Sequence, residues 1–148
     1  MKPFELAAAR RLLFFSPPEA SALISHTSEQ AWRRWESGAR KVPEDVENKI
    51  ISLIEWRRTA IGETVKKIRA APKKDAISLV WYASINDWET LPGREAHLWR
   101  PHQSVCAAVF AEFPGQLRFV RFDAPAYSVW LAGRKDSELL RGQWACLM

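Results

Sequence analysis

The chain has 148 residues, of which 47% are hydrophobic and eight are tryptophan, so a packed core is expected and intrinsic disorder is not. No apolar run approaches the ~20 residues that span a bilayer, and charges at Glu5, Arg10 and Arg11 interrupt any leader, so we expect a cytoplasmic protein with no membrane partner. The net charge is +5, with 15 Lys and Arg against 9 Asp and Glu in residues 1–74, and 7 against 8 in residues 75–148. This basic first half favours a polyanion such as nucleic acid, although a solvated charged face would look the same.

Three helices are predicted in the first 38 residues. The first runs from about residue 3 to residue 14, where apolar side chains recur at helical spacing. Ser16, Pro17 and Glu19 form a capping box with proline at the first helical position, which starts a second helix at residues 17–24. Only residues 25–27 separate it from a third helix, and two short helices joined this tightly indicate a helix-turn-helix.

The third predicted helix has two unlike faces. Ser28 can cap its N-terminus, and Gly38 can end it in a left-handed conformation. Ala31, Trp32 and Trp35 form one apolar stripe, which favours packing in the core over stacking on bases. The remaining positions carry polar or charged side chains: Glu29, Gln30, Arg33 and Arg34. A DNA-reading helix has this pattern, and so does an ordinary surface helix.

A basic loop at residues 39–43 precedes a long helix predicted from about residue 43 to residue 70. Three acidic residues near its N-terminus suit the positive end of the helix dipole. Apolar side chains keep a 3/4 rhythm as far as Ile68, and Gly62 can loosen the middle. Residues 70–74 are the expected boundary between a domain of residues 1–70 and a domain of residues 75–148.

Beyond this boundary the pattern becomes mixed. Residues 77–83 are rich in β-branched and aromatic side chains, which predicts a strand. Residues 117–123 alternate apolar and charged side chains, which predicts a second, half-buried strand. One or two helical turns are expected at residues 84–89, a helix at residues 103–113, and a helical tail from Pro125 onward. The expected fold class is therefore α+β, with a helix-turn-helix domain followed by a small α+β domain.

Two motifs carry a resemblance to known proteins. The first lies in residues 5–48: Glu5-Leu6, Arg10, Leu12, Leu13, Glu19-Ala20, Trp32, Trp35-Glu36-Ser37-Gly38 and Val42-Pro43-Glu44-Asp45-Val46-Glu47. The second lies far downstream: Trp99-Arg100 and Gln103-Ser104-Val105-Cys106-Ala107. In these residues the chain resembles the YdiL-like transcriptional regulators and the related anti-CRISPR-associated autorepressors of bacteria and phages.

The resemblance implies an N-terminal lambda-repressor-like (Cro/repressor-type) domain and a C-terminal α+β dimerisation domain. It also implies repression from an inverted-repeat operator and, for the autorepressors, binding of structured RNA. The chain departs from the family in its longer stretch past Phe113 and in the exposed positions of the third helix. The operator sequence therefore does not transfer to this chain.

Contacts to DNA are expected from the third helix and the residues at its two ends. The base-contacting candidates are Glu29, Gln30, Arg33 and Arg34. Gln30 suits adenine and Glu29 suits cytosine, whereas the two arginines suit guanine or phosphate. The phosphate-contacting candidates are Thr27, Ser28, Ser37, Arg40 and Lys41, which would fix register without reading sequence. The resemblance further implies that Arg10 pairs with Glu36 in a structural role.

Neither a metal site nor an enzyme is expected. His97 and His102 are five residues apart with a proline between them, and no cysteine or carboxylate completes a tetrahedral set at standard spacing. No nucleophile motif, glycine-rich phosphate loop or pair of carboxylates in an apolar frame is present. Cys106 and Cys146 belong to no CxxC pattern and are expected to be buried thiols. No cofactor is predicted.

The sequence thus predicts a homodimeric transcriptional repressor that binds double-stranded DNA at the nucleoid and regulates its own gene. Aromatic side chains of the second half are expected to bury the dimer contact: Trp81, Tyr82, Trp88, Trp99 and Phe110. Two alternatives use the same basic face. One is an RNA-binding regulator, and the other is an antitoxin-like module whose C-terminal half binds another protein.

Overall fold

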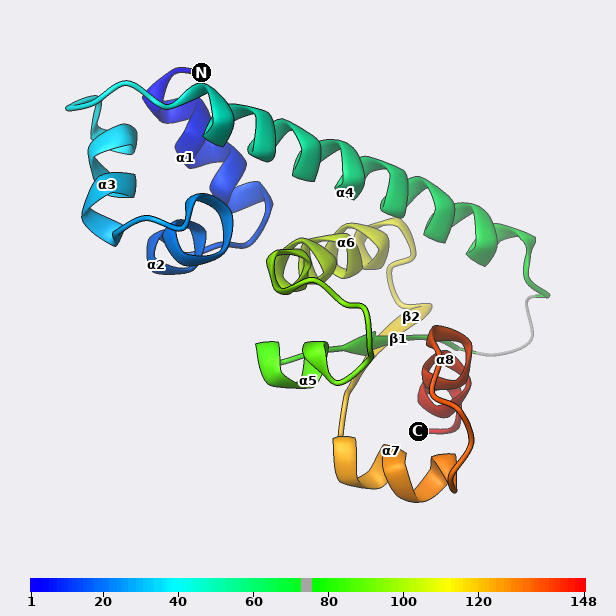
Figure 1. Cartoon of the computed structure of the whole chain (residues 1–148). Coiled ribbons are helices and arrows are strands. Elements are labelled where there is room, and N and C mark those ends of the chain that lie inside the picture. The colour runs from blue at the N-terminus through cyan, green and yellow to red at the C-terminus, as the bar shows by residue number, and fades with distance from the viewer. Residues whose placement is uncertain (73–75) are drawn as a thin grey trace.

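Figure 1 shows the computed structural model of the chain, which describes residues 1–72 and 76–148. In these ranges the fold is α+β and mostly helical with a small two-stranded sheet, which confirms that part of the predicted fold class. Two residues of the expected boundary, Lys73 and Lys74, lie outside the described residues. Among the described helices, none combines the length and the apolar character that crossing a membrane requires.

The first two helices begin where the sequence predicts. Helix α1 (Pro3–Leu12) ends two residues earlier than expected, because Phe14 adopts a left-handed φ of 68° that stops the helix. The capping box is confirmed, since Ser16 Oγ accepts a hydrogen bond from the backbone of Glu19 while the Glu19 carboxylate accepts one from the backbone of Ser16. The predicted second helix consists of α2 (Pro17–Ala20) and the π-helical turn η1 (Ser21–Ser25).

Helix α3 (Glu29–Ser37) also lies where predicted. Ser28 Oγ accepts a hydrogen bond from Ala31 N at 3.1 Å, and Gly38 ends the helix with φ 81°. Buried side chains from α1, η1, α3, the start of the long helix and the segments that connect these helices form the first core: Leu6, Leu13, Phe15, Ile24, Trp32, Trp35, Val42, Val46, Ile50 and Leu53.

Helix α4 (Glu44–Ala70) has 27 residues and is uninterrupted at Gly62. Its first half contributes to the first core. Apolar side chains of its second half, from Trp56 to Ile68, pack against the third core, which is Val105, Val109 and Leu117. The same helix therefore connects the N-terminal helices to the rest of the molecule, as Figure 1 shows.

The sheet consists of β1 (Ile77–Trp81) and β2 (Leu117–Arg121), which pair in parallel with Ile77 opposite Leu117. Parallel strands need a crossover connection. Here it contains α5 (Ile85–Glu89), the 3₁₀ turn η2 (Ala96–Leu98) and α6 (Trp99–Glu112). Helix α6 begins four residues before the predicted start, because proline is tolerated in the first turn of a helix, where its missing N–H has no intrahelical partner.

The tail is helical, as predicted, and forms two helices, α7 (Ala124–Leu131) and α8 (Glu138–Leu147). Figure 1 shows α4 and α6 on one side of the sheet and α7 and α8 on the other. Side chains from the crossover, the residues after β2 and the tail form the second core: Tyr82, Trp88, Trp99, Phe122, Tyr127, Trp144 and Ala145.

This second core corrects two expectations. Tyr82, Trp88 and Trp99 are already buried inside the single chain, so they are not free to bury a dimer contact. Cys146 is exposed rather than buried, because the neighbouring Trp144 and Ala145 take the inward positions of α8. Cys106 is buried as expected, and burial raises the pKa of its thiol to about 12.

Candidate nucleic-acid interface

The two faces of α3 are separated completely in the structure. Trp32 is 0% exposed and Trp35 is 7% exposed, and their rings meet edge to face at 5.7 Å. Gln30, Arg33 and Arg34 point away from the core and are exposed. Figure 1 shows α3 at the opposite end of the molecule from α8, so the tail helices do not cover it.

The four candidate base contacts fall into two kinds. Arg33 donates hydrogen bonds from Nε and Nη2 to Glu29 Oε1 at 3.0 and 2.7 Å. This pair lies at the surface, and such pairs contribute at most about 1 kcal/mol, so a ligand could replace it at little cost. Within the described residues, the side chains of Gln30 and Arg34 make no hydrogen bond or ion pair. These two side chains are therefore free to contact a ligand.

The candidate phosphate contacts surround both ends of α3. Ser28 caps the helix, and the hydroxyl of Thr27 lies 2.7 Å from that of Ser25. Ser37 Oγ donates to the carbonyl of Arg34, so its proton is already used inside the chain. Arg40 and Lys41 are exposed in the loop after the helix. The two cations are thus better suited to a phosphate than Ser37 is.

Arg10 and Glu36 meet underneath α3. Arg10 Nε donates to Glu36 Oε1 at 2.9 Å and to Oε2 at 3.2 Å, while its Nη1 donates to the carbonyl of Phe15 at 2.9 Å. The two side chains are only 11% and 13% exposed. The pair therefore ties α1 to α3 from inside the fold and is not accessible to a ligand.

One backbone conformation and one polar contact near this surface were not predicted. His26 takes a left-handed φ of 54° in the turn before α3, and Lys49 Nζ donates to the carbonyl of Ile24 at the end of η1. A lysine near the last carbonyls of a helix is a known stabilising arrangement. Lys49 and Ile24 are 25 positions apart, so no local sequence pattern predicts this hydrogen bond. Only the fold brings α4 next to η1.

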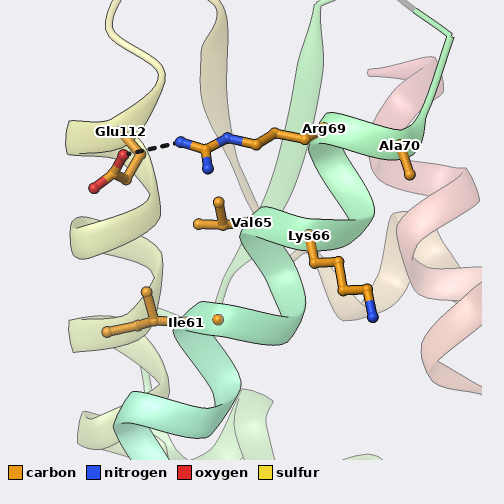
Figure 2. A pocket seen from close by; sticks show the side chains of 7 residues that line it. Ile61, Val65, Lys66, Arg69, Ala70 and Glu112 are labelled. Carbon is orange, nitrogen blue, oxygen red and sulfur yellow. Dashed lines mark ion pairs between the residues drawn. The ribbon is translucent and has the colours of Figure 1, made fainter.

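The far end of α4 carries a shallow cavity of about 660 Å³ between α4 and α6. Figure 2 shows Ile61 and Val65 of α4 directed toward α6, and Arg69 reaching toward Glu112, with 3.5 Å between the paired atoms. In the described part of the chain no group of three or more His, Cys, Asp or Glu side chains could hold a metal ion.

Comparison with known proteins agrees with the sequence motifs. The sequence profile of the family described as Aca2/YdiL-like matches residues 1–117, which include every element from α1 to α6. The chain belongs to the Aca2/YdiL-like family. The resemblance stated from the two motifs is thereby confirmed.

Two relatives of this family cover most of their own length in the match. The Aca2 repressor of Pectobacterium phage ZF40 is 30% identical over 109 residues, which are 73% of this chain and 91% of the relative. The uncharacterized protein YdiL of Escherichia coli (strain K12) is 22% identical over 113 residues, which are 75% of this chain and 94% of the relative. Helices α7 and α8 lie beyond the residues that the family profile matches.

Proposed function

We propose that this protein is a transcriptional repressor that binds a specific DNA sequence and regulates its own gene. In this proposal α2 and η1 form the first helix of a helix-turn-helix, and α3 is the recognition helix that enters the major groove. The observation that carries it is the separation of faces on α3, with Trp32 and Trp35 in the core and Gln30 and Arg34 exposed and unpaired among the described residues. The similarity to a protein named a repressor supports it.

The proposed contacts follow the chemistry of each side chain. Gln30 would read adenine, Arg34 would read guanine, and Glu29 and Arg33 would reach bases after their mutual pair opens. Thr27, Ser28, Ser37, Arg40 and Lys41 would contact phosphates on either side of the groove. Residues 1–70 would form the DNA-binding domain and residues 75–148 the dimerisation domain.

A homodimer would match an operator with twofold symmetry. The two recognition helices would then read half-sites about 34–36 Å apart, one turn of the double helix. The outer edge of β2 is the surface we propose for the contact, since the described sheet has only two strands and backbone groups on an unpaired edge favour addition of another strand. Phe110 of α6 and Phe119 of β2, 43% and 37% exposed with ring centroids 5.2 Å apart, form an apolar pair next to this strand that a second copy would bury.

The deciding experiment is selection of bound sequences from random duplex DNA at increasing salt concentration. Enrichment of an inverted repeat supports the proposal, whereas salt-dependent binding without enrichment reduces the function to non-specific DNA binding. Preference for a hairpin RNA over the selected duplex would favour the RNA-binding alternative instead.

A pair of variants tests the recognition helix directly. Arg34→Ala should weaken binding to the selected operator by about 1–3 kcal/mol and relax the preference at one base position if Arg34 reads guanine. Arg58→Ala, which removes another exposed arginine, on α4, is the control for net charge and should leave the base preference unchanged. Equal weakening of all sequences by Arg34→Ala would assign this residue to phosphate.

A further inference from the structure

The N-terminal helices and the C-terminal α/β part meet along a narrow seam between η1 and η2. Leu98 of η2 packs against both the first and the second core, so it joins them directly. Beside it the seam opens into a cavity of about 490 Å³, lined by side chains of η1, α4 and η2 that include Leu23 and Trp56. Since this space is not filled by side chains, the packing of Leu98 and the shared helix α4 hold the two parts together here.

Among the described residues, one ion pair crosses the seam. Arg100, at the start of α6, donates from Nε to Glu19 Oε2 at 2.9 Å, and its Nη2 lies 2.8 Å from the same oxygen. The other oxygen of Glu19 accepts the backbone N–H of Ser16 that completes the capping box of α2. The carboxylate therefore binds α2 with one oxygen and α6 with the other, across 81 residues of sequence.

The guanidinium of Arg100 is held firmly on its own side. It lies 4.0 Å from the centroid of the Trp99 ring, and its Nη1 donates to Gln103 Oε1 at 2.7 Å. Gln103 Nε2 and Trp99 Nε1 both donate to the carbonyl oxygen of Tyr82 at 2.8 Å, just after β1 ends. A continuous chain of hydrogen bonds thus runs from the sheet to the N-terminus of α2. Glu19, Trp99, Arg100 and Gln103 all belong to the two sequence motifs that carry the family resemblance.

We propose that Arg100 is a positioning residue that fixes the orientation of α2 and α3 relative to the C-terminal part, and so sets the operator spacing that a dimer accepts. The inference rests on the proposed function. Helix α4 and the packing of Leu98 already connect the two parts, and the ion pair adds a polar contact that restricts rotation of α2 relative to α6. The side chains of the pair are 29% and 23% exposed, and a partly exposed ion pair contributes little to stability, so its loss should change geometry without unfolding the protein.

The expected effect is on the coupling between half-sites. Binding of the second half-site gains from an effective concentration that depends on how well the geometry matches the span. Arg100→Gln should therefore lower affinity for the best two-site operator by about fivefold, while affinity for a single half-site stays the same. It should also reduce discrimination against operators whose spacer is one base pair longer or shorter, a displacement of about 3.4 Å along the axis.

The test has two stages, each with the full chain. The first measures the pKa of the Glu19 carboxyl by NMR in the wild type and in Arg100→Gln. Burial opposes ionisation of this group, but hydrogen bonds from Arg100 and Ser16 outweigh burial and hold its pKa below the ordinary value. The pKa should rise in the variant, and an unchanged pKa would mean that the pair does not form in solution, which overturns the inference.

The second stage measures binding to the selected operator, to its single half-site and to the two altered spacers. Loss of spacing discrimination in Arg100→Gln, with half-site affinity kept and discrimination largely retained in Arg100→Lys, supports the inference. Unchanged discrimination in Arg100→Gln overturns it and leaves the proposed function standing. If the wild type selects no inverted repeat, the proposed function fails, and this inference fails with it. Thermal unfolding of each variant, with Arg58→Gln as the charge control, separates a change of geometry from a loss of folding.

Discussion

His102 lies among aromatic side chains, and its environment disfavours the charged imidazolium. The ring centroids of Trp88 and Tyr82 lie 4.9 and 5.6 Å from its own. Burial, and secondarily the positive charge of Arg94, lower the pKa of His102 to about 4 from an ordinary 6.5. Because the folded-state pKa is depressed, the contribution of this group to stability is present above pH 6.5 and is lost as pH falls toward 4.

This shift predicts acid sensitivity that a single substitution removes. Between pH 6.5 and pH 4 the wild type should lose up to about 3 kcal/mol of unfolding free energy through His102, and less if the exposed edge of the ring relieves the shift. His102→Phe should lose correspondingly less over the same range. Urea denaturation at several pH values measures both proteins, and parallel stability curves would contradict the prediction. The comparison between the two proteins cancels the titration of the carboxyl groups.

Two glutamates of α3 allow the stability contributions of a buried and an exposed ion pair to be compared. Glu36 is 13% exposed and pairs with the equally buried Arg10, whereas Glu29 is 42% exposed and pairs with Arg33 at the surface. Glu36→Gln should therefore cost about 3 kcal/mol, because it leaves Arg10 buried without its counterion. Glu29→Gln should change the unfolding free energy by at most about 1 kcal/mol. Urea denaturation checks both, and similar values for the two would contradict a structural role for Glu36.

At the scale of elements, the end of α7 is held in a conformation that suits glycine. Ala132 closes the helix with φ 51° and ψ 46°, and its side chain is exposed. A left-handed conformation costs a non-glycine residue about 1–2 kcal/mol, while glycine adds about 0.4–1 kcal/mol of unfolded-state entropy. Ala132→Gly should therefore stabilise the protein by roughly 0.5–1 kcal/mol and raise its Tm.

The control for this variant is the same substitution in a regular helix. Ala8 is exposed in the middle of α1, so Ala8→Gly should destabilise the protein by about 0.5–1 kcal/mol. Thermal unfolding compares the two, and the expected shifts have opposite signs. A lower Tm for Ala132→Gly would show that the left-handed conformation at this position is not retained in solution.

At the scale of the whole molecule, α7 and α8 complete the fold beyond the residues that the family profile matches. Trp144 and Tyr127 pack on Phe122. The buried Arg141 pairs with Asp136 at 2.6 Å and lies over the rings of Phe122 and Tyr127. The tail helices thus cover one face of the sheet from within the chain. The proposed dimer contact is accordingly the remaining edge at β2, not this face.

Substitution of a β2 residue by lysine tests the proposed dimer contact. If a second copy pairs with β2, Phe119→Lys should convert the dimer into a monomer, because it sets a charge in the middle of the buried edge. Val129→Lys is the control, since Val129 is 82% exposed on α7, away from the sheet edge. Light scattering coupled to size-exclusion chromatography measures the mass of each variant. A dimer that survives Phe119→Lys would move the contact elsewhere.

The local sequence was sufficient to predict a structural feature wherever that feature depends on residues three or four positions apart. The capping box at Ser16 and Glu19, the cap at Ser28, the left-handed Gly38 and the two faces of α3 are all of this kind. Each depends on backbone hydrogen bonds or on the period of one helix, and both can be read from neighbouring residues. The family could be recognised for a similar reason, since its two motifs are short and contiguous.

Only the tertiary structure decided the features that join distant residues. The sequence predicts strands near residues 77–81 and 117–121, but no local pattern predicts that they pair in parallel. No local pattern predicts either that the tail helices cover one face of the sheet. For this reason Tyr82, Trp88 and Trp99 were expected at a dimer contact, although they are buried in the chain's own core. The pair of Glu19 with Arg100 has the same origin. Helical period and caps are set by chemistry within a single turn, whereas contacts between elements depend on the free energy of packing the whole chain.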